Sequence, residues 1–142
     1  MIVVVDASVA IKWCVPEDNT SDAEQLLDPR FKLHAPDLLL PEFANILWKK
    51  CRQNDLDIRD AEMALKLFRR QSITIHPHDD VLTTAFLGAY ETKQAVYDWI
   101  YLALALSLSC PLITADRKFL IALRKTRFSK ELIWIENAPN LI

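Results

Sequence analysis

Glycine is almost absent from this chain: Gly88 is the only glycine among 142 residues. Loops that wrap the phosphates of a nucleotide need several glycines, because the backbone must approach the phosphate closely. The sequence therefore excludes nucleotide-dependent chemistry of the P-loop and dinucleotide-binding types.

Cysteine is scarce as well. Cys14, Cys51 and Cys110 are an odd number, lie far apart and stand in apolar or helical surroundings. We expect buried, reduced thiols of a cytoplasmic protein and no disulfide framework. The three histidines have none of the spacings of a zinc site, and we expect no catalytic histidine among them.

Long hydrophobic runs and a strong net charge are also missing. The longest apolar stretch, residues 99–108, is too short to cross a bilayer, and no signal peptide follows Met1. The formal net charge is −2, so any nucleic-acid binding must come from local basic patches. We expect no association with a membrane.

The chain does contain a regular alternation of strands and helices. Short apolar runs predict strands at 2–5, 32–35, 73–76, 112–114 and 132–135. Helical patterns cover 8–14, 22–27, 41–52, 59–70, 80–91, 98–108 and 117–126. We predict one α/β domain over residues 1–142, with a mostly parallel five-stranded sheet and about seven helices in three layers.

Four acidic residues stand where these strands end or helices begin. Asp6 and Asp116 follow apolar strands, and Glu42 and Asp98 open helical stretches. In parallel α/β folds, sites form outside the carboxyl ends of the strands. Carboxylates gathered there repel one another unless a cation lies between them. The pattern therefore predicts a site for Mg²⁺ or Mn²⁺ suited to attack on a phosphodiester.

Each acid also has a purely structural interpretation. Asp6, Asp98 and Asp116 can cap the helices behind them, and Glu42 suits the positive end of a helix dipole. This interpretation is weaker for the four together, because all of them fall at the same predicted sheet edge.

Three polar residues can support the carboxylates. Ser8 and Thr114 each lie two positions from an acid and can hydrogen-bond a carboxylate, and Asn45 lies one helical turn after Glu42. Ordinary capping and solvation explain the same residues equally well.

The basic residues are grouped. The stretch 117–130 carries six Lys and Arg and no acid, and its first members, Arg117 and Lys118, can guide a phosphate backbone toward Asp116. The basic residues near the end of the helix at 41–52 are more simply a solvated helix terminus.

With these residues in place, the chain resembles the PIN-domain ribonucleases, and within them the VapC-type toxins of prokaryotic toxin–antitoxin pairs. The matching stretches are residues 5–13, 35–48, 96–105 and 113–117, in the order and spacing of the family. The resemblance implies an α/β/α domain that cleaves RNA with Mg²⁺ or Mn²⁺ held by Asp6, Glu42, Asp98 and Asp116. It also implies a homodimer and a small antitoxin partner.

One departure from the family is Trp99, where relatives carry a small residue after the acid. The indole either reshapes the pocket or fills a gap in the core.

Two other functions remain open from the sequence. The first is a PIN-like module that binds RNA or protein without cutting, although the intact set of four acids argues against it. The second is a phosphotransfer protein with Asp6 as the phosphoacceptor, which lacks the paired acid expected beside Asp6.

Overall fold

The computed structural model describes residues 1–142 and contains one five-stranded, fully parallel sheet. The strand order is β3-β2-β1-β4-β5. The strands span Ile2–Val5 (β1), Lys32–Pro36 (β2), Ile73–His76 (β3), Leu112–Thr114 (β4) and Leu132–Trp134 (β5). This confirms the predicted fold class.

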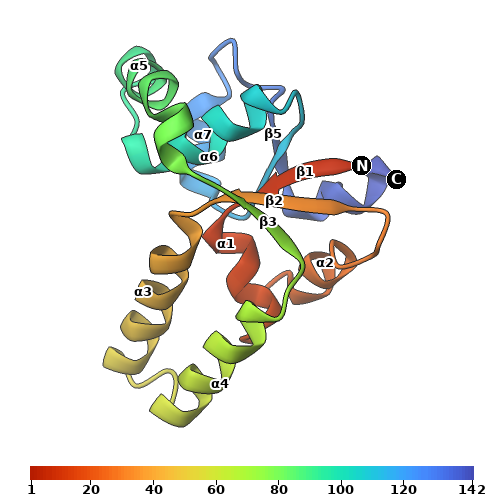
Figure 1. Ribbon diagram of the computed structural model, residues 1–142, viewed down its shortest axis with the longest axis vertical. Coiled ribbons are helices and arrows are strands. Elements are labelled where there is room, and N and C mark those ends of the chain that lie inside the picture. Colours follow the sequence, from red (N-terminus) through yellow and green to blue (C-terminus); the bar gives the residue numbers. More distant parts are fainter.

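The chain forms seven α-helices, which lie on both sides of the sheet (Figure 1). They are α1 (Ala7–Ala10), α2 (Thr20–Gln25), α3 (Leu39–Arg52), α4 (Ile58–Arg69), α5 (Leu82–Thr92), α6 (Val96–Ser107) and α7 (Arg117–Leu123). Helices α5, α6 and α7 lie on one side of the sheet, and α1 and α2 lie on the other. Helices α3 and α4 form a hairpin that projects away from the strands. No helix has the length and apolar character needed to cross a membrane.

The side chains of β1 divide between two hydrophobic clusters, because successive strand residues point to opposite faces. Val4 joins the larger cluster with helix α6, and Val3 and Val5 join the smaller one beside α2. All three valines have no solvent exposure. Burial on both faces explains why this strand is apolar throughout and places its end, Asp6, in the interior.

Several helix boundaries differ from those predicted. The helix expected at 8–14 is α1 followed by a 3₁₀ turn at Ile11–Trp13, and Pro16 lies just beyond. A further 3₁₀ turn, His78–Val81, precedes α5. Helix α7 ends at Leu123, where the Thr126 hydroxyl donates to the Leu123 carbonyl (2.8 Å). Polar side chains of this kind offer the backbone an alternative to the helix ladder.

The C-terminal segment was not predicted to be helical. It forms a 3₁₀ helix, Ile135–Leu141, whose Ile135 and Ala138 complete the smaller cluster. The cysteines are free, but only Cys110 is buried; Cys14 and Cys51 are half-buried. The expectation of three buried thiols was wrong for these two, because their helices end near the surface.

Candidate metal centre

The four predicted acids line a single cavity of about 440 Å³ at the carboxyl end of the sheet. Asp6 follows β1 and Asp116 follows β4, two strands that pair directly in the sheet. Glu42 enters from the first turn of α3, and Asp98 is the third residue of α6. Four segments that are distant in sequence thus converge on one pocket.

Asp6 is buried and accepts hydrogen bonds on both carboxylate oxygens. The Ser8 hydroxyl and the Val9 N–H (3.2 Å) donate to Oδ1, and the Thr114 hydroxyl donates to Oδ2. Burial, with a smaller contribution from the charge of Asp116, outweighs the lowering effect of these donors and raises the pKa of Asp6 to about 6. These three donors hold the Asp6 carboxylate in a fixed orientation at the end of β1.

Ser8 and Thr114 also connect the two strand ends to each other. The Ser8 hydroxyl accepts from the Ala115 N–H (2.9 Å), and the Thr114 hydroxyl accepts from the Asp116 N–H (3.0 Å). Each hydroxyl therefore donates to Asp6 while accepting from the loop after β4. The two hydroxyls fix Asp6 and the loop that carries Asp116 relative to each other.

Asp98 and Asp116 stand closer to solvent. The Asp116 side chain accepts from the Phe119 N–H (3.1 Å) and caps α7. The same side chain therefore serves as a helix cap and lines the cavity. Asp98 does not cap α6, which begins at Val96, and its side chain makes no hydrogen bond within the chain. Burial, followed by the charges of Asp116 and Glu42, raises the pKa of Asp98 to about 6.

Glu42 is oriented by a buried tyrosine that the sequence did not single out. The Tyr101 hydroxyl of α6 donates to Glu42 Oε2 at 2.6 Å. Burial raises the pKa of Glu42, and the Tyr101 hydrogen bond opposes that rise. Burial and the Glu42 charge raise the pKa of Tyr101, so its hydroxyl stays a donor. Asn45 lines the same cavity, one helical turn beyond Glu42.

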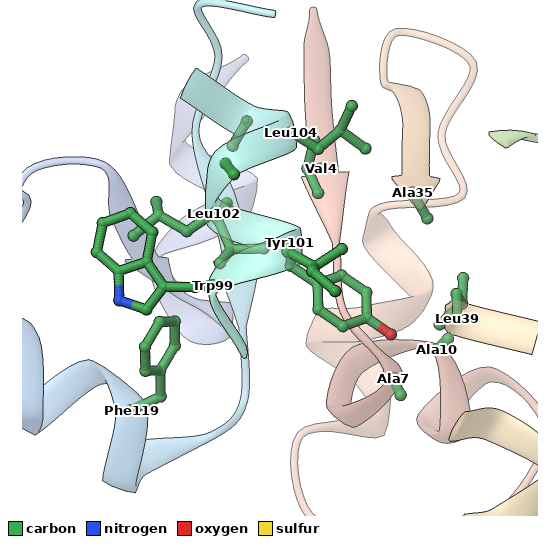
Figure 2. Close-up of a cluster of buried hydrophobic side chains, with 14 of the residues drawn as sticks. Val4, Ala7, Ala10, Ala35, Leu39, Trp99, Tyr101, Leu102, Leu104 and Phe119 are labelled. Carbon is green, nitrogen blue, oxygen red and sulfur yellow. The ribbon is translucent and has the colours of Figure 1, made fainter. Parts of the chain in front are cut away.

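Trp99 points away from this cavity. Figure 2 shows Trp99 and Tyr101 leaving α6 on opposite sides. The indole is 1% exposed, donates from Nε1 to the Thr92 hydroxyl (2.7 Å) and meets the Phe128 ring edge-on at 4.7 Å. Of the two interpretations of this residue, the structure therefore supports the core-filling one.

Arg117 and Lys118 do not line the cavity. The Arg117 guanidinium lies over the Trp134 ring, 4.8 Å from its centroid, and Lys118 is exposed on α7. The one basic side chain among the lining residues is Lys49 of α3. The sequence pattern assigned Lys49 to a solvated helix end, although its spacing of seven from Glu42 places both on one helix face.

The histidines lie outside the cavity. His34 Nδ1 and His76 Nε2 are 2.8 Å apart on neighbouring strands β2 and β3, and His78 Nδ1 pairs with Asp37 Oδ1 at 2.7 Å. These contacts agree with structural positions for all three.

The donor set of the cavity fits a hard divalent cation. Its ionisable ligands are carboxylates, which Mg²⁺ and Mn²⁺ prefer over nitrogen or sulfur. No three acidic, histidine or cysteine side chains are grouped closely enough to hold an ion as they stand. Burial raises the pKa values of Asp6 and Asp98 because it disfavours their ionised forms, and a bound cation would favour those forms.

The fold and the cavity together define an α/β protein with a carboxylate centre at the end of a parallel sheet. The family model of the PIN domain matches residues 3–124. Ribonuclease VapC3 of Pyrobaculum aerophilum is 35% identical over 120 residues, which are 83% of this chain and 92% of the relative. The chain belongs to the PIN-domain family, in the group of the VapC ribonucleases.

Other similar proteins agree with this placement. Ribonuclease VapC9 of Mycobacterium tuberculosis is 33% identical over 117 residues, covering 81% of this chain and 86% of the relative. The crystal structure of PAE2754 from Pyrobaculum aerophilum superimposes with a TM-score of 0.71 and 26% identity, over 99% of this chain and 88% of that one. VapBC2 from Rickettsia felis, solved bound to a DNA fragment from its promoter, shares the fold at a TM-score of 0.62 and 13% identity, over 94% of this chain and 97% of that one.

Proposed function

We propose that this protein is a Mg²⁺- or Mn²⁺-dependent endoribonuclease, and the toxin of a toxin–antitoxin pair in the cytoplasm. The observation that carries the proposal is the convergence of Asp6, Glu42, Asp98 and Asp116 on one cavity. The names of the VapC relatives support RNA as the substrate.

In this proposal the chain's own residues hold and orient the reactants. Asp98 and Asp116, which are nearer to solvent, and the fixed carboxylate of Asp6 provide the cation's oxygen ligands. Tyr101 holds one oxygen of Glu42, so that the other remains for the cation or its water. When bound, the cation supplies a water of lowered pKa and neutralises charge that develops on the phosphate.

The test is RNA cleavage by metal-free protein after addition of Mg²⁺ or Mn²⁺, comparing the wild type with Asp98→Asn and Asp116→Asn. The Asp98 side chain makes no hydrogen bond within the chain, so its replacement should leave the fold intact. We expect each variant to lose at least about a hundredfold in activity, the scale on which one lost electrostatic group acts in other active sites. Asp60→Asn, at an exposed position of α4, is the matched control.

Cleavage that persists with chelator, or equally in Asp98→Asn and the wild type, would sink the mechanism. Absence of cleavage by the wild type with either metal would instead favour the alternative, a PIN-like module that binds RNA or protein without cutting it.

The α3–α4 hairpin of this chain offers a surface to which an antitoxin partner would bind. A cavity of about 520 Å³ between these helices is lined by Leu40, Pro41, Ala44, Leu65, Phe68 and Arg69. It shares Pro41 with the carboxylate cavity, so an apolar segment bound there would reach the site. Exposed apolar side chains of this hairpin, such as Trp48, support binding of a partner.

A homodimer is the second assembly that we propose. Phe86, Leu87 and Tyr90 of α5 are exposed, and three large apolar side chains on one short helix are unusual for a surface that stays in water. Light scattering of the isolated protein tests this: a monomer at micromolar concentration would contradict it.

A further inference from the structure

The mouth of the carboxylate cavity carries an aromatic side chain that the fold does not need. Tyr97 lines the cavity and is 64% exposed. It belongs to neither hydrophobic cluster, and its hydroxyl makes no hydrogen bond within the chain. Tyr101, one turn further along α6, is buried and bonded to Glu42. Of the two tyrosines in the cavity, one is structural and the other is free.

Tyr97 is also adjacent to a carboxylate of the site. It immediately precedes Asp98, so the two Cα atoms lie about 3.8 Å apart. When an RNA phosphate lies near the carboxylates, the base of the nucleotide that carries it, or the base of the adjacent nucleotide, therefore comes within reach of the Tyr97 ring. Stacking on an aromatic ring is available to all four bases, because each has a π face.

The same cavity is also lined by one basic side chain, from a different helix. Lys49 of α3 is exposed, lines the same cavity and makes no ion pair with the chain's own acids. Its neighbour Lys50, by contrast, is paired with Glu17 at 2.6 Å. Among fourteen lining residues, four of them acidic, Lys49 is the only cation. An unpaired ammonium at the rim of an acidic cavity is placed to bind a phosphate that the carboxylates would otherwise repel.

We propose that Tyr97 and Lys49 form a nucleotide subsite of the cavity. The ring of Tyr97 stacks on one unpaired base, and the ammonium of Lys49 binds a backbone phosphate beside it. Bases inside a duplex have both faces covered by their neighbours, so the subsite selects single-stranded or looped RNA at the point of cleavage. The subsite rests on the ribonuclease function proposed above, and it adds which residues read the substrate.

The experiment measures RNA binding without cleavage, in an Asp116→Asn background with Mg²⁺. The probes are a fluorescent single-stranded RNA of about twelve nucleotides with all four bases at each position, and a duplex of similar length. We expect Tyr97→Ala to weaken single-strand binding about tenfold, and Tyr97→Phe, which keeps the ring, to stay within about twofold. Tyr90→Ala is the matched control, because Tyr90 is 83% exposed on α5 and does not line the cavity.

Salt dependence separates the two residues. Lys49→Gln should reduce the slope of log affinity against log salt by about 0.7, the value for one phosphate contact on a single strand. Tyr97→Ala should leave that slope unchanged, since stacking displaces no counterion. The affinity for Mn²⁺ should be unaltered by Tyr97→Ala, which a general disturbance of the site would change.

Equal binding by wild type and Tyr97→Ala, or a preference for duplex, would overturn the subsite while leaving ribonuclease activity to be judged by cleavage. A change of oligomeric state in Tyr97→Ala without loss of RNA affinity would also overturn it, and would assign the ring to a protein interface. If the wild type neither binds nor cuts RNA, the proposed function itself fails.

Discussion

At the scale of single residues, the carboxylates of the cavity are held in different ways. Asp6 is fixed by two hydroxyls and a backbone N–H, whereas Asp98 has no partner in the chain. Glu42 lies between these extremes, with one hydrogen bond from Tyr101. In the proposed metal centre, this mixture of fixed and free carboxylates would let a cation bind without rearrangement of the fixed ones.

The Tyr101 hydroxyl should affect metal binding more than stability. In Tyr101→Phe the buried ring is retained, but Glu42 loses the donor that orients it and supports its ionisation. We expect the dissociation constant for Mn²⁺ to rise about three- to tenfold, as measured by calorimetry, which is the scale of one hydrogen bond to a charged group. Tyr90→Phe, which removes an exposed hydroxyl outside the cavity, is the control. An unchanged dissociation constant in Tyr101→Phe would show that Glu42 needs no positioning.

The sequence indicated which acids to examine, but it could not indicate their partners. Asp6, Glu42, Asp98 and Asp116 stand out because they interrupt apolar runs at element boundaries. The contact between Tyr101 and Glu42 spans 59 positions, and Tyr101 looks like an ordinary core residue in its own helix. Local spacing alone carries no signal for such a pair, since it depends on how α3 meets α6.

At the scale of elements, the packing of α5 against α6 depends on the chain's one glycine. A Cβ atom added to Gly88 would lie 2.3 Å from the Trp99 ring, far inside van der Waals contact. Trp99 cannot easily move, because it is held by Thr92 and Phe128. The large Trp99 side chain thus fits against α5 only because residue 88 is a glycine.

The effect of Gly88→Ala on the free energy of unfolding should therefore depend on the residue at position 99 and change sign when Trp99 is replaced. In the wild type we expect it to lower the free energy of unfolding by about 1–3 kcal/mol through overpacking. In a Trp99→Leu background the clash is gone, and the better helix propensity of alanine should stabilise α5 by up to about 1 kcal/mol. Urea denaturation of the four proteins of this double-mutant cycle measures the coupling; additive effects would contradict the packing seen here.

Element boundaries were predicted less well than element types. All five strands and all seven α-helices fall close to their predicted positions, because apolar periodicity marks them clearly. The 3₁₀ helix Ile135–Leu141 was missed, since its short apolar contacts follow no helical period. Its Ile135 and Ala138 pack in the smaller hydrophobic cluster, a tertiary contact that local periodicity does not encode.

At the scale of the whole molecule, the strand order brings the four acids of the cavity together. β1 and β4 are neighbours at the centre of the sheet, although more than 100 residues separate them in the chain. Their adjacent carboxyl ends place Asp6 beside Asp116, and the first turns of α3 and α6 bring Glu42 and Asp98 to the same cavity (helices in Figure 1). Parallel topology was foreseeable from the alternation of elements, but the order of the strands was not.

The most direct test of the metal centre is a calorimetric titration of Mn²⁺ into metal-free protein at several pH values. The carboxyls of Asp6 and Asp98, with pKa values raised to about 6, hold protons below that pH, and a bound cation must displace them. Affinity should therefore rise about tenfold per carboxyl between about pH 5 and pH 7, then level off.

Asp98→Asn should bind Mn²⁺ at least about tenfold more weakly and show a shallower pH dependence, while Asp60→Asn should match the wild type. Saturable Mn²⁺ binding that strengthens with pH and depends on Asp98 is the result expected if the four carboxylates form a metal centre. Absence of Mn²⁺ binding, or equal affinity in the wild type and Asp98→Asn at every pH, would contradict it.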